Sequence, residues 1–127
     1  ELTGEISLVE AGMDRFFNLK KKNNFFGAKA LKDIIQSGVD IKIVYLEVDV
    51  DNADARGNEP VYHNNKIVGV VTSGGYGFRT KKSLAFAYIK SDLANGGNLE
   101  IEIQGQRRKT KILDKVVYDP DNEKLKA

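Results

Sequence analysis

The stretch Ile41-Lys42-Ile43-Val44-Tyr45-Leu46-Glu47-Val48 decides the fold class of this chain. Ile41, Ile43 and Tyr45 occupy every second position, and apolar, largely β-branched residues continue to Val50, which is typical of a long strand. Shorter segments with closely spaced turns follow, and no helical pattern occurs after Gly38. This arrangement predicts a mainly β protein, a small antiparallel β-barrel of Greek-key type.

The remaining strands are expected between turns rich in glycine and asparagine. We expect a hairpin of residues 60–62 and 67–71, a glycine-dense loop at 73–77, a strand at 83–88, and a second hairpin of 99–103 and 107–117. In the second hairpin Glu100 and Glu102 alternate with Ile101 and Ile103, which indicates one solvated and one buried face.

Residues 1–38 have a different pattern, a short α/β segment that precedes the barrel. Ser7 and Glu10 have the spacing of a capping box, so we expect a helix over 8–13, followed by a short strand over 16–19 and a polar turn. A clear helix follows from Ala28, and Gly38 stands where a C-terminal cap belongs. We therefore divide the chain into 1–38, a helix-strand-helix segment, and 39–127, the barrel.

Composition excludes several classes of function. The 127 residues suffice for one main core, and the absence of cysteine excludes disulfides, thiolate metal sites and cysteine nucleophiles. A net charge of +2 is too small for binding to nucleic acid or membranes through bulk charge, and we expect neither partner. The missing initiator methionine suggests a piece of a longer polypeptide.

Two loop motifs fail their templates. Asp49, Asp51 and Asp54 invite a calcium-loop interpretation, but Pro60 stands where a bidentate glutamate is needed. Gly75-Tyr76-Gly77 follows a predicted strand as a dinucleotide fingerprint does, but Thr80 replaces the third glycine and no helical run follows. A flexible turn is the favoured interpretation of the glycine motif.

The single residues with reactive side chains do not form a catalytic set. His63 is the one histidine and lies in a predicted turn, while Ser73 lacks the surroundings of a nucleophile elbow. The basic runs around Lys81 and Arg107 suit a solvated face better than a nucleic-acid surface. We predict no catalytic residue and no metal ligand.

An ordered series of motifs carries a resemblance over residues 1 to about 118. The motifs are Glu1-Leu2-Thr3-Gly4-Glu5, Leu8-Val9-Glu10-Ala11-Gly12-Met13, Arg15-Phe16, Phe26-Gly27, Gly57-Asn58-Glu59-Pro60-Val61, Lys66-Ile67-Val68-Gly69, Thr72-Ser73-Gly74-Gly75-Tyr76-Gly77 and Lys82-Ser83-Leu84-Ala85-Phe86-Ala87-Tyr88. In this order they resemble the C-terminal domain of the aminomethyltransferase family, which includes the glycine cleavage T-protein. They are most similar to the folate-binding portion of dimethylglycine and sarcosine dehydrogenases.

The resemblance implies one-carbon transfer from a methylated or aminomethyl amine to tetrahydrofolate. The family's catalytic aspartate belongs to segments upstream of Glu1, so we expect the chain to be a C-terminal fragment that is inactive alone. The basic position near the folate tail corresponds to Lys20, Lys21 or Lys22, and Tyr76 is a further expected folate contact. The implied partners are the upstream domains and folate, and the implied compartment is the cytoplasm, or the mitochondrial matrix in a eukaryote.

A second hypothesis stays open beside this one. The chain is then a docking module that contacts no ligand, with the pairs Phe16-Phe17 and Phe25-Phe26 as its docking surface. An isolated fragment with such a surface is expected to self-associate.

Overall fold

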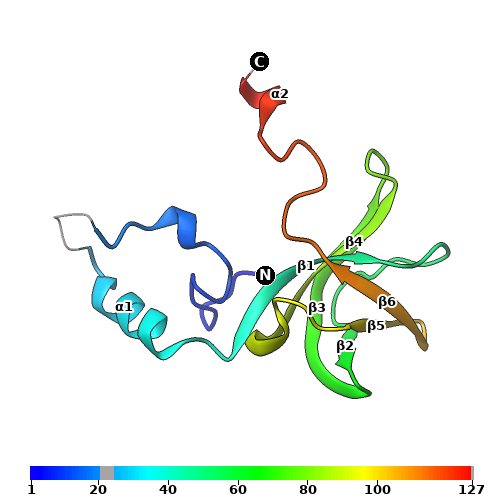
Figure 1. Ribbon diagram of the computed structural model, residues 1–127, viewed down its shortest axis with the longest axis horizontal. Helices are drawn as coiled ribbons and strands as arrows, with labels where there is room; N and C mark the ends of the chain where they lie inside the picture. The colour runs from blue at the N-terminus through cyan, green and yellow to red at the C-terminus, as the bar shows by residue number, and fades with distance from the viewer. Residues whose placement is uncertain (21–24, 127) are drawn as a thin grey trace.

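The computed structural model describes residues 1–20 and 25–126. Figure 1 shows a β-barrel on one side, an N-terminal segment with one helix on the other, and a C-terminal segment that rises away from the barrel. The elements are the 3-10 turns η1 (Asp14–Phe16) and η2 (Ser91–Leu93), the helices α1 (Ala28–Ser37) and α2 (Glu123–Lys126), and the strands β1 (Ile41–Val48), β2 (Pro60–His63), β3 (Lys66–Gly77), β4 (Lys82–Lys90), β5 (Glu100–Ile103) and β6 (Gln106–Ile112).

The six strands form a closed antiparallel barrel in the order β1-β4-β3-β2-β5-β6. Strands β2, β3 and β4 follow one another directly, and β1 lies beside β4, which is the Greek-key arrangement that the sequence predicts. Closure between β1 and β6 removes the unpaired edges that an open sheet would present.

The core lies inside the barrel, and on β1 it uses the face opposite to the one that the alternation of Ile41, Ile43 and Tyr45 predicts, because these three side chains are only partly buried. On β1 the buried residues are Val44, Leu46 and Val48, and the residues between them are partly exposed. Strand β4 contributes small side chains opposite these positions, with Ala85 paired to Leu46 and Ala87 paired to Val44. The buried cluster consists of Val44, Leu46, Val48, Ala55, Val61, Val71, Ala85, Ala87, Ile89, Leu99, Ile101 and Ile103.

The segment 73–77, predicted as a glycine-dense loop, is instead the second half of β3. Glycine occurs at this strand position for a steric reason. A Cβ on Gly74 would lie 2.5 Å from the carbonyl oxygen of Ala55 and 2.9 Å from that of Leu84. The glycine therefore allows the loop after β1 to approach β3 closely. A β-bulge between Val71 and Ser73 adjusts the register with β4.

The predicted helix over 8–13 is wrong, although its capping box is present. The backbone N–H of Ser7 donates to Glu10 Oε2 (2.7 Å), and that of Glu10 donates to Ser7 Oγ (3.3 Å). Gly12, at φ +64°, then ends the segment after one turn, and the N–H of Met13 donates to the carbonyl of Leu8 (2.9 Å). This is a Schellman closure, which stops helix growth.

The predicted strand over 16–19 is also absent: Phe16 ends η1 (Asp14–Phe16), and residues 17–19 belong to no strand. The barrel is closed, so a further strand finds few free backbone groups to pair with. The first half of β1 offers the N–H of Ile43, and the carbonyl of Glu10 accepts it (2.9 Å). The N-terminal segment is therefore linked to this part of β1 by one backbone hydrogen bond from a turn, and not by the series of hydrogen bonds that a paired strand would make.

Helix α1 is confirmed and ends at Gly38, whose φ of +78° suits glycine. Strand β6 ends at Ile112, earlier than the predicted residue 117. Its pairing with β1 stops where Ile112 faces Leu46, and the chain then leaves the barrel. Among the described residues, no helix has the length and apolar character needed to cross a membrane.

Candidate functional site

The predicted folate contacts fall in separate parts of the chain. Lys20 is exposed in the N-terminal segment, where its N–H donates to Asn18 Oδ1 (2.9 Å). Tyr76 lies near the end of β3, beside the hairpin to β4, and Figure 1 shows this hairpin and the N-terminal segment on opposite sides of the view. Lys21 and Lys22 lie outside the described residues. The structure does not bring Lys20 and Tyr76 together.

The loop between β1 and β2 closes the end of the barrel at which Tyr76 lies. Ala55 of this loop is fully buried and belongs to the core cluster. Its neighbour Asp54 accepts a hydrogen bond at Oδ1 from the hydroxyl of Ser83, the buried polar residue of β4 (2.6 Å). A hydrogen bond to a carboxylate satisfies the buried hydroxyl and anchors the loop over the barrel.

Two clefts open beside this loop and share Tyr76, Val50 and Lys81. The first, of about 700 Å³, is lined by Val50, Asp51, Asn52, Ala53, Asp54, Arg56, Tyr76, Lys81 and Gln104. The second, of about 480 Å³, is lined by Glu47, Val48, Asp49, Val50, Tyr76, Lys81, Lys82, Ser83, Lys109, Thr110 and Lys111. The first balances acids and bases, whereas lysines predominate in the second.

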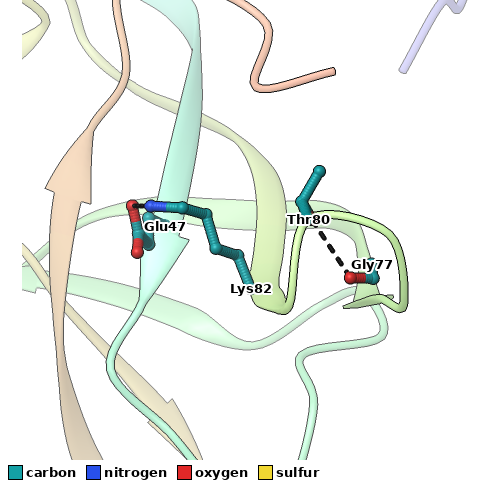
Figure 2. Close-up of polar contacts among 4 residues, drawn as sticks. All are labelled: Glu47, Gly77, Thr80 and Lys82. Atoms are coloured by element: carbon teal, nitrogen blue, oxygen red, sulfur yellow. Dashed lines mark hydrogen bonds and ion pairs between the residues drawn. The ribbon is translucent and has the colours of Figure 1, made fainter.

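The hairpin between β3 and β4 supplies Lys81 to both clefts and Lys82 to the second. Its loop is closed by two donors to the carbonyl of Gly77, the N–H of Lys81 (2.7 Å) and the hydroxyl of Thr80 (3.1 Å). Figure 2 shows the Thr80 bond and, beside it, the ion pair of Lys82 with Glu47 on the neighbouring strand β1. These interactions close the hairpin loop and link the start of β4 to β1.

Aromatic rings line the same end. Tyr76 is 43% exposed, and its ring packs edge-on against Phe78 at a centroid distance of 5.2 Å. Phe78, at the hairpin tip, is 87% exposed. The ring of Tyr76 is thus partly exposed and is held on one side by its contact with Phe78.

The C-terminal segment returns to this hairpin. The guanidinium of Arg79 donates to the hydroxyl of Tyr118 (3.2 Å) and lies over its ring. A hydrogen bond from Lys124, with smaller contributions from nearby positive charge, lowers the pKa of Tyr118 below its ordinary value.

The first residues of the chain cover the outer face of β3 and β4. Glu1 accepts hydrogen bonds from the hydroxyls of Thr72 and Ser73, and the Ser73 bond lowers the pKa of its carboxyl. The hydroxyl of Tyr88 donates to the Glu1 carbonyl (2.9 Å), and burial raises the pKa of Tyr88. A small groove of about 250 Å³ adjoins Ser73, beside the stacked rings of Tyr45 and Phe86.

The remaining candidates from the sequence have structural contacts. His63 ends β2, where Nδ1 bonds the carbonyl of Asn98 (2.9 Å) and Nε2 bonds the amide of Asn64 (3.0 Å). The Asn64 amide is then the donor to Nε2, which leaves Nδ1 as the donor to Asn98. Within residues 1–20 and 25–126, no three histidine, aspartate or glutamate side chains form a metal-binding group.

The second cleft is not predicted by the sequence. The basic runs are evident there, but their local pattern does not indicate that Lys81 and Lys82 meet Lys109 and Lys111 around one concave surface. Strand alternation placed Lys109 and Lys111 on one face of β6. The pairing of β6 with β1, which brings them toward the hairpin, is a long-range contact with no local signal.

A family model matches residues 42–119, and its description is the glycine cleavage T-protein C-terminal barrel domain. The chain belongs to this family. The match runs from β1 past β6, so the family assignment that the sequence motifs suggested is confirmed.

Relatives of this barrel include proteins of two kinds. The human protein named dimethylglycine dehydrogenase, mitochondrial, is 35% identical over 128 residues, which cover 98% of this chain and 15% of that protein. An aminomethyltransferase from Synechocystis sp. is 32% identical over 119 residues, 93% of this chain and 32% of that protein. The chain thus spans a third or less of these relatives.

A solved structure has the same fold. The glycine cleavage system aminomethyltransferase T from Bartonella henselae superposes with a TM-score of 0.79 over 90% of this chain and 32% of its own, at 22% identity. At this identity the comparison supports the fold alone, and it confirms the predicted barrel of the family.

Proposed function

We propose that this chain is the C-terminal part of a tetrahydrofolate-dependent protein that transfers a one-carbon unit from a methylated or aminomethyl amine. The supporting observation is the family membership together with relatives named aminomethyltransferase and dimethylglycine dehydrogenase. Tetrahydrofolate supplies the nitrogen atoms that accept the one-carbon unit. In this proposal residues 1–38 end the preceding α/β portion, and 39–127 form the barrel that closes one side of the folate pocket.

The described residues fit a supporting role toward folate. Tyr76 presents a partly exposed ring beside a cleft of about 700 Å³, which suits stacking with a flat bicyclic ring. Lys20, and Lys21 and Lys22 beside it, carry amines that suit the carboxylates of the folate tail. Because Lys20 and Tyr76 lie apart, we propose that they contact different parts of the pocket, with upstream residues between them.

The chain alone is proposed to be inactive. Asp54, an acid lining the first cleft, is engaged by Ser83, and the first cleft balances its acids with Arg56 and Lys81. The family resemblance places the catalytic aspartate upstream. The barrel then contributes shape and binding contacts and leaves proton transfer to the rest of the protein.

We expect the isolated 127-residue chain to transfer no methylene from an N-methylated glycine to tetrahydrofolate. We also expect it to bind tetrahydrofolate with a Kd above about 10 μM, or roughly −7 kcal/mol, because most of the pocket lies elsewhere. Isothermal titration calorimetry measures the affinity, and a coupled assay for methylenetetrahydrofolate measures turnover. Tighter binding or turnover by the chain alone would contradict the proposal.

In the parent protein, Tyr76→Ala is expected to weaken tetrahydrofolate binding about tenfold, the loss of one stacking contact of about 1–3 kcal/mol. Tyr62→Ala is the matched control, because Tyr62 lies on β2 and lines neither cleft. Equal effects of the two substitutions would remove Tyr76 from the folate site and leave the family assignment intact.

Exposed phenylalanines favour a second candidate, a docking module without ligand contact. The side chain of Phe26 is fully exposed and that of Phe16 is 64% exposed, while Phe17 is partly buried. Exposed apolar side chains that gather into one patch mark surfaces for protein–protein contact. In this alternative the N-terminal segment supplies the docking surface.

We expect the isolated chain to self-associate at concentrations above about 100 μM, since weak apolar contacts give dissociation constants in this range. Multi-angle light scattering of the chain and of the double variant Phe16→Ser/Phe26→Ser measures the mass, and the variant should remain a monomer. Ile67→Ser, on a side chain that is 63% exposed on β3, is the control. A monomeric chain at all concentrations would count against the docking surface.

A further inference from the structure

The second cleft gathers lysines from three elements around one concave surface. Lys81 comes from the loop between β3 and β4, Lys82 from the start of β4, and Lys109 and Lys111 from β6. The space between them measures about 480 Å³. We call it the lysine cleft.

The strand pairing explains how these lysines meet. Lys111 of β6 faces Glu47 of β1, and Lys82 of β4 reaches the same glutamate from the other side. Lys109 lies on the same outer face of β6 as Lys111. The hydroxyl of Thr110, which lies between them in the sequence, donates a hydrogen bond to the carbonyl of Leu99 (3.0 Å). The strands that carry these lysines therefore lie on both sides of β1.

Charge in the lysine cleft is not balanced by the acids that line it. Four lysines and two acids, Glu47 and Asp49, line it, which leaves two more positive than negative groups. Glu47 is engaged by Lys82. The ion pairs found among the described residues join Lys82 to Glu47 and Arg107 to Glu102, so neither includes Lys81, Lys109 or Lys111.

The backbone at Lys81 holds a cation at the mouth of the cleft. Its φ is +53°, a left-handed conformation that side chains other than glycine, asparagine and aspartate rarely adopt. The hydrogen bonds to Gly77 maintain this conformation. The loop thus fixes the Lys81 backbone where its amine can reach both clefts.

We propose that the lysine cleft binds a multivalent anion, a ligand with two or more carboxylates or phosphates. Several separate ammonium groups suit several anionic groups at once, whereas a single monovalent anion would engage only one or two of them. Concave walls strengthen the attraction because part of the solvent screening is removed. The proposal does not rest on folate binding by this chain, since it concerns the charge of the cleft alone.

Tripolyphosphate and a peptide of five glutamates are the two probes. Both are multivalent anions, and the first carries phosphates whereas the second carries carboxylates. At 50 mM NaCl we expect the chain to bind at least one of them with a submillimolar Kd by calorimetry, and to lose at least tenfold in affinity at 500 mM NaCl. In NMR spectra the amide signals of residues 81–82 and 109–111 should shift on titration. Binding of one probe but not the other identifies the anion class, and binding of neither overturns the proposal.

Substitutions distinguish binding at the lysine cleft from attraction of the anion to positive charge anywhere on the protein. Lys109→Gln/Lys111→Gln should weaken binding at least tenfold, whereas Lys66→Gln/Lys90→Gln, with the same loss of charge on strand residues outside the cleft, should weaken it less than twofold. Lys81→Gly removes an amine at a backbone conformation that glycine adopts readily, so reduced binding there is not a folding defect. Equal losses in both double variants would overturn the proposal.

Discussion

Gly69→Ala is expected to lower the free energy of unfolding by at least about 3 kcal/mol, which corresponds to a fall in Tm of about 10 °C or more. A Cβ at this position would lie 2.8 Å from the Cα of Ile89 and closer still to the carbonyl oxygen of Tyr88. Both are backbone atoms of the paired strand β4, so no side chain can rotate away to relieve the clash. Urea unfolding followed by circular dichroism measures the loss.

The same strand provides an internal comparison. Gly74→Ala should also destabilise the protein, because its Cβ would lie 2.5 Å from the carbonyl oxygen of Ala55. Gly75→Ala should be neutral or stabilise by up to about 0.5 kcal/mol, since nothing lies within 4 Å of its Cβ and alanine restricts the unfolded chain. If all three substitutions had similar effects, close backbone approach would not be the reason for these glycines.

These glycines also show where sequence reasoning reached its limit. The composition of Ser73-Gly74-Gly75-Tyr76-Gly77 predicts a flexible loop, because glycine is common in turns. In the structure these residues belong to β3, and Gly74 is required by a loop that lies about twenty residues earlier in the chain. Local composition cannot distinguish a turn from a close approach, because the neighbouring backbone is not local.

Patterns carried by adjacent residues were predicted correctly. The strand β1, the alternation of β5, the helix α1 with its glycine cap, and the bonds of the Ser7–Glu10 capping box all occur in the structure, although β1 buries the face opposite to Ile41, Ile43 and Tyr45. The interpretation was wrong where one local signal competed with another. The capping box favoured a helix, but Gly12 ended it after one turn.

In the candidate site, too, local sequence predicts some residues, whereas long-range contacts determine the others. Tyr76 was singled out from its sequence motif, and it does line both clefts. The lysine cleft depends on β1 standing between β4 and β6, and the bond from Ser83 to Asp54 depends on the loop folding back over the barrel. These contacts follow from the closed topology, which a single sequence indicates only as a fold class.

Leu46→Ala is expected to cost about 3–4 kcal/mol, a loss typical of truncating a fully buried leucine that neighbours cannot replace. Leu46 pairs with Ala85 on β4 and with Ile112 on β6, so it lies where the barrel closes. The small core residues of β4 cannot fill the space, because Ala85 and Ala87 have no side chain beyond Cβ. Chemical denaturation monitored by circular dichroism gives the change in free energy.

Ile67→Ala is the matched control, because Ile67 is a strand residue of the same size that is 63% exposed, and its loss should stay within about 0.5 kcal/mol. The double variant Leu46→Ala/Ala85→Leu returns the lost volume from the opposite strand. It should recover at least about 1 kcal/mol if the cost of Leu46→Ala is an unfilled cavity. No recovery, together with a lower denaturant m-value, would instead indicate that the seam between β1 and β6 had opened, because partial unfolding of the native state reduces the surface exposed on denaturation.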